Sequence, residues 1–334
     1  MSEVNWRIGH LDHLESPWGN AGGVVKSVED VEAMAKTGVG WIEAGSYTLE
    51  PRLGNQYNPE TGELRIDPDT DMPIEVYRYI NETGEMFNSL GMPNKGIDEV
   101  SKEIPEMVRT AEAYGKKLIV NVAPVSKDPV AETQELVQRV YKAGAHGVIV
   151  NGGCPNVEVD GGKREEALSL NAAATYMVLS GLGHIVKKYA KVMFRGTPQP
   201  SLLQAKTVYQ SIERAGTVST IFIPNSWGGV WLDRDGKSII KVPGGISGKT
   251  GPAMSKQAFE QVEMAARIFN GSGIDVVVSS GIANSEPLDI RAAKQLRKAL
   301  DLGAVAAAGS TFYFVPERGW AEDTDKMLRE FAEL

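Results

Sequence analysis

A cysteine between two asparagines is the stretch of this sequence with the clearest chemical potential. The apolar run at 148–150 is followed directly by Asn151-Gly152-Gly153-Cys154-Pro155-Asn156, which contains the only cysteine of the chain. Such a run is typical of a buried parallel strand, and the glycines let the backbone turn sharply where the strand ends. The thiol would then lie on a loop between two amides. It is either a reactive group in a hydrogen-bonding environment or a small buried hydrophobe.

The overall composition narrows the class of protein. The 334 residues carry a net charge of −8 and are 42% hydrophobic, and the pI is about 5.3. This acidic balance argues against binding to nucleic acid, which needs clustered Lys and Arg. No stretch approaches the roughly 18 apolar residues of a membrane span, and the first residues lack the apolar core of a signal peptide. We therefore expect a cytoplasmic globular protein with no nucleic-acid or membrane partner, and the scattered histidines indicate no metal site.

Strands and helices alternate along most of the sequence. Strands are predicted near residue 16 and at 39–44, 118–122, 147–150, 192–194, 220–223, 275–278 and 304–308. Helices are predicted at 28–36, 97–114, 129–142, 168–189, 202–215, 256–269, 286–300 and through 331. Eight β/α steps favour a (β/α)₈ TIM barrel, a single domain over residues 1–334, with its active site at the carboxyl ends of the strands. An open doubly wound sheet is the alternative, but no G-x-G-x-x-G follows the first strand.

Some local features refine this prediction. Ser27 with Asp30 resembles a capping box for the first helix, and Ser285 is a candidate N-cap for the helix at 286–300. Pro105 is expected to break the helix that it interrupts or to start its second half. The segment from 46 to about 93 is rich in Pro, Gly, Asn and Asp and lacks periodicity. We expect it to be a long, functional excursion after the second strand.

Asparagine recurs where the predicted strands end. In a barrel these ends face one another, and amides come from five segments: Asn20, Asn88, Asn121, Asn151 with Asn156, and Asn225. Each amide alone is typical of a turn. Together they can both donate to and accept from a heterocycle that has C=O and N–H groups. The glycine-rich loops with Gly281 and with Gly309-Ser310 follow the last two strands, where barrels commonly hold a phosphate.

Several motifs in this order resemble the class 1 dihydroorotate dehydrogenases and the related catalytic domain of dihydropyrimidine dehydrogenase. The resemblance extends from about Ser16 to Phe314. Its motifs are Gly19-Asn20-Ala21-Gly22-Gly23, Thr48-Leu49-Glu50-Pro51-Arg52-x-Gly54-Asn55, Asn88-Ser89-Leu90-Gly91-Met92-Pro93-Asn94, Asn151-x-x-Cys154-Pro155-Asn156, Asn225-Ser226, Gly244-Gly245-Ile246-Ser247-Gly248 and Gly309-Ser310-Thr311. These families are FMN-containing (β/α)₈ barrels, and the first belongs to pyrimidine biosynthesis.

The resemblance implies a role for each matching residue. FMN would be bound by Ala21, Gly22, Gly45, Ser46, Asn121, Asn151, Arg195, Gly245, Ser247, Gly281, Gly309 and Ser310. A dihydropyrimidine would be bound by Asn88, Asn151, Asn156, Asn225 and Ser226. Cys154 would be the base that removes the C5 proton while hydride passes from C6 to flavin N5. A cysteine at this position is the class 1 residue, because the second class has serine there. A homodimer is also implied.

Two positions depart from the resembled pattern. Gly45 stands where the family has a lysine that reaches flavin and substrate, and Arg195 stands where it has a second lysine near the flavin. Arginine keeps a permanent charge, although its geometry differs, whereas glycine supplies no charge at all. The substrate carboxylate of dihydroorotate therefore lacks its usual partner, and Arg52 and Lys249 are the candidate replacements.

Three functions remain open from the sequence. The first is oxidation of dihydroorotate or a close analogue. The second is oxidation of another cyclic amide or heterocycle that lacks the carboxylate of orotate. The third is a catalytically silent flavin- or ligand-binding protein, in which Cys154→Ala would have no effect. The electron acceptor is also open among fumarate, a quinone, oxygen and an electron-transfer subunit.

Overall fold

Eight parallel strands close into a barrel. The computed structural model describes residues 5–153, 167–283, 291–310, 313 and 320–334. The strands are β3 (Trp18–Asn20), β4 (Trp41–Tyr47), β9 (Lys117–Val122), β10 (Gly147–Asn151), β11 (Val192–Arg195), β12 (Val218–Ile223), β15 (Asp275–Val278) and β16 (Ala306–Gly309). Each pairs with the next along the chain, and β16 returns to β3. This arrangement confirms the predicted (β/α)₈ barrel and excludes the open sheet.

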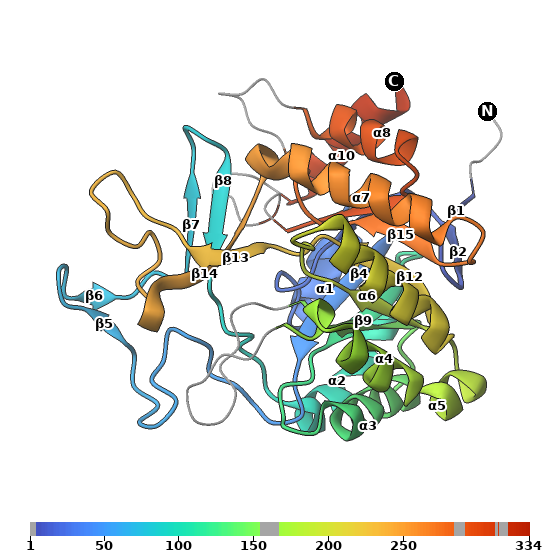
Figure 1. The fold of residues 1–334 in the computed structure, drawn as a ribbon, viewed down its shortest axis with the longest axis horizontal. Coiled ribbons are helices and arrows are strands. Elements are labelled where there is room, and N and C mark those ends of the chain that lie inside the picture. Colours follow the sequence, from blue (N-terminus) through green and yellow to red (C-terminus); the bar gives the residue numbers. More distant parts are fainter. Residues whose placement is uncertain (1–4, 154–166, 284–290, 311–312, 314–319) are drawn as a thin grey trace.

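Helices cover the outside of the barrel (Figure 1). They are α1 (Val28–Ala35), α2 (Ile97–Ala113), α3 (Pro129–Lys142), α4 (Ala172–Ser180), α5 (Gly183–Lys188), α6 (Leu202–Ala215), α7 (Ser255–Phe269), α8 (Ala292–Asp301) and α10 (Trp320–Ala332). The α3 and α6 helices have the predicted bounds. The capping box before α1 is confirmed, because the Ser27 hydroxyl accepts from the Asp30 amide while Asp30 accepts from the Ser27 amide.

The structure corrects three helix predictions. Pro105 does not break α2, since the buried stripe that includes Val100, Ile104 and Met107 anchors both halves of the helix. The predicted helix at 168–189 is divided into a 3₁₀ turn (Leu168–Leu170), α4 and α5, because the Asn171 side chain caps a new start at α4. The helix predicted from 286 begins at Ala292, after an extended Arg291. The proposed cap Ser285 lies outside the described residues.

A short hairpin covers the amino-terminal end of the barrel. Strands β1 (Trp6–Ile8) and β2 (Leu11–Leu14) pair in antiparallel fashion. Ile8, Leu11 and Leu14 belong to the same buried cluster as the inward-facing barrel residues, which include Ile149 and Met193. Burial of these apolar side chains fills the amino-terminal end of the barrel interior, so we expect the site at the carboxyl ends of the strands.

Two excursions combine into a sheet beside the carboxyl end of the barrel, and we call this sheet and its connecting loops the lobe. The excursion after β4 contains β5 (Ile66–Asp67), β6 (Met72–Pro73), β7 (Tyr77–Ile80) and β8 (Glu85–Asn88), and the segment after β12 contains β13 (Trp227–Val230) and β14 (Ile246–Thr250). Four of these strands form an antiparallel sheet in the order β13-β14-β8-β7 (Figure 1). The excursion after β4 is as predicted. The segment after β12 was expected to be a loop up to about Pro252, and its strands β13 and β14 and the shared sheet were not predicted.

Two further findings concern the described residues only. None of their helices has the length and apolar character needed to cross a bilayer. Within the same residues, His, Cys, Asp and Glu side chains form no group of three or more that could hold a metal ion. The single-domain organisation of residues 1–334 stays a prediction.

Candidate functional site

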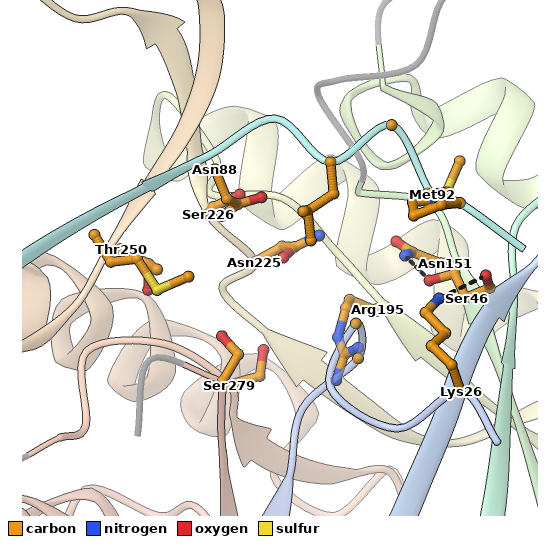
Figure 2. A pocket seen from close by; sticks show the side chains of 17 residues that line it. Lys26, Ser46, Asn88, Met92, Asn151, Arg195, Asn225, Ser226, Thr250 and Ser279 are labelled. Carbon is orange, nitrogen blue, oxygen red and sulfur yellow. Dashed lines mark hydrogen bonds between the residues drawn. The ribbon is translucent and has the colours of Figure 1, made fainter. Parts of the chain in front are cut away.

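A pocket of about 220 Å³ lies at the carboxyl ends of the barrel strands, next to the lobe (Figure 2). The predicted site residues that line it are Gly22, Ser46, Asn88, Asn151, Arg195, Asn225, Ser226 and Ser310. They come from six strand ends of the barrel and from β8 of the lobe. The barrel and the lobe therefore bring together residues that are up to 288 positions apart in the sequence, from 22 to 310.

Two amides are fixed around the turn that precedes Cys154. Asn151 donates from Nδ2 to the Ser46 hydroxyl at 3.0 Å, and its Oδ1 accepts from the Gly153 amide at 3.1 Å. Asn225 donates from Nδ2 to the Gly153 carbonyl at 3.0 Å. The backbone just before the cysteine is thus held by two of the predicted substrate amides. Cys154 and Asn156 themselves lie outside the described residues, so their roles stay predictions.

The lobe supplies the other side of the pocket. Asn88 ends β8, where it pairs with Gly248 of β14. Asn88 lines the pocket together with Ser226, Asn151 and Ser46 (Figure 2). The sheet positions Asn88 through pairing of two excursions, which explains why the excursion is needed for the site.

A buried ion pair lies beneath the pocket. Arg195 is 3% exposed and Glu43 is completely buried. Both guanidinium Nη atoms contact the carboxylate, with 2.7 Å between Nη2 and Oε2. Asn121 also donates to Glu43 Oε1, at 2.6 Å, and the guanidinium lies 5.3 Å from the centre of the Phe222 ring. Sequence reasoning missed Glu43, although one charged residue in an otherwise apolar strand was the available signal.

Gly22 brings the backbone directly against this ion pair. A Cβ atom at Gly22 would lie 2.7 Å from Glu43 Oε1 and 2.9 Å from Arg195 Nη1. The neighbouring backbone is fixed as well, because the Ala21 amide donates to the Gly309 carbonyl and the Gly23 amide donates to the Gly45 carbonyl. Only glycine fits here, and its missing side chain leaves a flat cradle over the ion pair.

The remaining predicted cofactor residues do not line the pocket. They are Ala21, Gly45, Asn121, Gly245, Ser247, Gly281 and Gly309. Two of them carry buried polar atoms without a hydrogen-bond partner, namely Asn121 Oδ1 and Ser247 Oγ. Burial of such polar atoms costs free energy unless a ligand or a water molecule forms a hydrogen bond with them. Their roles therefore stay predictions that a bound ligand would test.

The pocket residues fit FMN. The missing side chain at Gly22 leaves room for a flat ring against the barrel, and Asn121, which also bonds Glu43, carries a buried Oδ1 atom without a partner. Ser279 after β15 and Ser310 after β16 line the pocket where barrels commonly bind phosphate. The residues that would hold the cofactor are thus Gly22, Ser46, Arg195, Ser279 and Ser310.

Lys26 is a pocket residue that the sequence analysis missed. Its ammonium donates to the Ser46 carbonyl at 3.2 Å and lies 5.5 Å from the centre of the Tyr47 ring (Figure 2). The two candidate replacements for the absent lysine do not line the pocket. Arg52 donates to the Gly91 carbonyl, and Lys249 pairs with Glu85 beside the Trp231 ring. A lysine just before a helix cap was the only sequence signal for Lys26.

The other lining side chains that were not predicted as site residues include Met86, Leu90, Met92 and Thr250. Met86 and Thr250 lie on paired strands of the lobe, β8 and β14. Their contribution could not be read from the sequence, because it depends on the pairing of the two excursions.

The chain is similar to known dihydroorotate dehydrogenases. The profile of the family described as "Dihydroorotate dehydrogenase" matches residues 7–298. The dihydroorotate dehydrogenase B (NAD(+)) catalytic subunit of Parabacteroides distasonis is 24% identical over 291 residues, which cover 85% of this chain and 81% of that relative. The dihydroorotate dehydrogenase (quinone) of Aeromonas salmonicida is 23% identical over 268 residues, covering 78% and 70% of the two chains.

A solved structure has the same fold. The dihydroorotate dehydrogenase of Eimeria tenella in complex with ferulenol superposes with a TM-score of 0.73 at 16% identity, and the alignment covers 98% of this chain and 84% of that chain. At this identity the likeness concerns the fold alone. The family match spans most of the barrel and all the strands that carry the pocket except β16. The chain therefore belongs to the dihydroorotate dehydrogenase family of FMN-dependent oxidoreductases.

Proposed function

We propose that this protein oxidises the C5–C6 bond of a dihydropyrimidine, namely dihydroorotate or a close analogue. The main support is the convergence of Asn88, Asn151, Asn225 and Ser226 in one pocket beside Arg195. Amides and a hydroxyl can pair with the alternating C=O and N–H groups of a pyrimidine ring. Membership of the dihydroorotate dehydrogenase family supports the same reaction class.

In the proposed reaction the substrate loses a proton from C5 and a hydride from C6, so that a C5=C6 double bond forms. Bound FMN supplies the acceptor for the hydride. Cys154 is the proposed base, which takes the C5 proton as a thiolate. A free thiol has a pKa of about 8.5, so the thiolate needs help from its surroundings at neutral pH.

The described turn before Cys154 supports such a role. The Asn151 and Asn225 side chains hold the Gly153 amide and carbonyl. The same two amides line the pocket. Substrate position and the position of the base are therefore coupled through one turn, which favours a reactive geometry.

The charged groups around the pocket bear on whether the substrate carries a carboxylate or is neutral. Lys26 brings an ammonium to the pocket, and this favours a substrate with a carboxylate, such as dihydroorotate. Two observations favour the alternative, a neutral cyclic amide: Gly45 has no side chain, and Glu43 neutralises Arg195. We propose dihydroorotate first, because Lys26 contributes a cation on the pocket wall itself.

An anaerobic absorbance spectrum tests the proposal. The purified protein should carry a flavin band, and dihydroorotate should bleach it. Bleaching by dihydrouracil but not by dihydroorotate would favour the neutral substrate instead. A flavin band that no dihydropyrimidine bleaches would contradict the proposed reaction, and failure to take up added FMN would also contradict the cofactor.

We further propose that the protein is a cytoplasmic homodimer. Size-exclusion chromatography with light scattering measures the oligomeric state, and a monomer at micromolar concentration would contradict it. The reduced protein can be mixed with fumarate, a quinone, oxygen or NAD(+), and the recovery rate of the flavin band identifies which of them reoxidises it.

A further inference from the structure

Glu43 is a charged residue in the interior of the barrel, where burial of a charge costs free energy. Its neighbours Ile42 and Ala44 are fully buried, and so is Glu43 itself. A carboxylate removed from water costs several kcal/mol unless it is paired and hydrogen-bonded. Arg195 and Asn121 supply these partners. Because apolar residues of similar volume are often at least as stable as a buried ion pair, stability alone does not account for this arrangement.

The position of the pair suggests what it does. Arg195 lines the pocket, whereas Glu43 lies behind it and contacts both Nη atoms of the guanidinium. An isolated guanidinium at this place would act strongly on a bound group, because the surroundings are dry and the dielectric constant is low. With the carboxylate in contact on the far side, the pair presents no net charge to the pocket.

We propose that Glu43 is a positioning residue that neutralises Arg195 and thereby keeps the reduction potential of bound FMN low. Positive charge near the flavin ring stabilises the reduced form, which gains negative charge, and so raises the potential. Glu43 removes most of that effect while it fixes the orientation of the guanidinium. The inference rests on the FMN site of the proposed function but not on the identity of the substrate.

The test is the midpoint potential of FMN in Glu43→Gln, measured without substrate. The wild-type and variant holoproteins are each reduced stepwise with dithionite in equilibrium with a reference dye. Glutamine keeps the size of the side chain and can still accept a hydrogen bond from Arg195, but it leaves the guanidinium charge uncompensated. At a given potential, we expect the ratio of reduced to oxidised FMN to be at least tenfold higher in the variant than in the wild type. For a two-electron couple, this corresponds to a rise of the midpoint potential by about 30 mV.

Two further variants separate this effect from a general disturbance of the fold. In Glu43→Gln/Arg195→Gln the pair is replaced by two neutral groups, so the potential should stay close to that of the wild type. Glu15→Gln removes the partner of the buried Lys116 at the opposite end of the barrel, and it should leave the potential unchanged.

An unchanged or lower potential in Glu43→Gln with FMN bound would overturn the inference. If Glu43→Gln does not fold, Glu43→Asn removes the same charge with a shorter neutral side chain. It should also raise the potential, and an unchanged or lower potential in this variant would overturn the inference. A different result would contradict the proposed function, namely that no dihydropyrimidine bleaches the flavin. That result does not depend on the midpoint potentials of the variants.

Discussion

The two ends of the barrel use polar side chains in different ways. At the amino-terminal end, Asp275 accepts from the Gly9 amide, Lys116 pairs with Glu15, and the His146 ring accepts from the Leu118 amide. These interactions hold the β1–β2 hairpin and the strand ends together over an apolar filling. At the carboxyl end, the polar side chains surround a pocket instead.

The difference shows how one closed barrel separates stability from function. At the closed end, the Gly9 amide, Lys116 and His146 have partners within the protein, and removal of such a partner should affect stability. At the pocket end, Asn121 Oδ1 and Ser247 Oγ are buried without partners, which is costly in a protein without ligand. Substitutions at this end should therefore alter cofactor and substrate binding more than folding.

The largest effect is expected at the pocket end for Cys154→Ala. Loss of a general base typically lowers the rate by about 10² to 10⁴, so kcat for the dihydropyrimidine that bleaches the flavin should fall by that factor. FMN content should remain as in the wild type, because the thiol is proposed to act on the substrate. Stopped-flow measurement of flavin reduction checks this directly. A variant with the wild-type rate would support a catalytically silent thiol.

A pair of glycine substitutions compares the two ends. Gly22→Ala places a Cβ atom within 2.9 Å of both Glu43 and Arg195, so the loop or the ion pair must shift. Overpacking of this kind costs about 1–3 kcal/mol, and FMN should bind roughly tenfold to a hundredfold more weakly. Gly147→Ala at the closed end makes only ordinary contacts of 3.4–3.6 Å. Its FMN affinity, measured by fluorescence titration, should equal that of the wild type; equal weakening in both variants would contradict the comparison.

Lys26→Met tests which charge the pocket selects. Loss of a charged hydrogen bond costs about 1.5–3 kcal/mol, so orotate should bind about 10- to 100-fold more weakly, whereas uracil should be unaffected. Binding is followed by the change in flavin absorbance and needs no turnover. Lys249→Met is the matched control, because Lys249 pairs with Glu85 in the lobe. If the affinities for orotate and uracil fell equally, Lys26 would not recognise a carboxylate.

The smallest effect concerns stability at the closed end. Burial, together with the charge of Lys117, lowers the pKa of His146 below its ordinary value of 6.5. The unfolded chain therefore takes up the proton first as the pH falls below 6.5, and stability is lost in that range. Between pH 6.5 and pH 5, the Tm of the wild type should fall by about 2 °C more than the Tm of His146→Gln. Differential scanning calorimetry measures this, and parallel curves would refute the role of His146.

Much of the site could be predicted because its residues follow regular strands. The alternation of strands and helices indicated the barrel, and residues at strand ends must then meet at one face. Asn151, Arg195 and Asn225 were found in this way, and all three line the pocket. Lys26 and Glu43 were missed because their only local signals, a lysine before a helix cap and one charged residue in an apolar strand, are not specific to a site.

The sequence by itself determined the barrel, the end at which the site lies and the residue types offered there, since these depend on local periodicity and on motifs. The tertiary structure decided the rest. The four-stranded sheet joins β8 to β14, so that the Ser89 hydroxyl donates to the Ile246 carbonyl 157 residues away, and Glu43 meets Arg195 across 152 residues. Such pairings depend on which distant segments the closed barrel brings together, and short strands such as Ile66–Asp67 carry too few residues for a periodic signal.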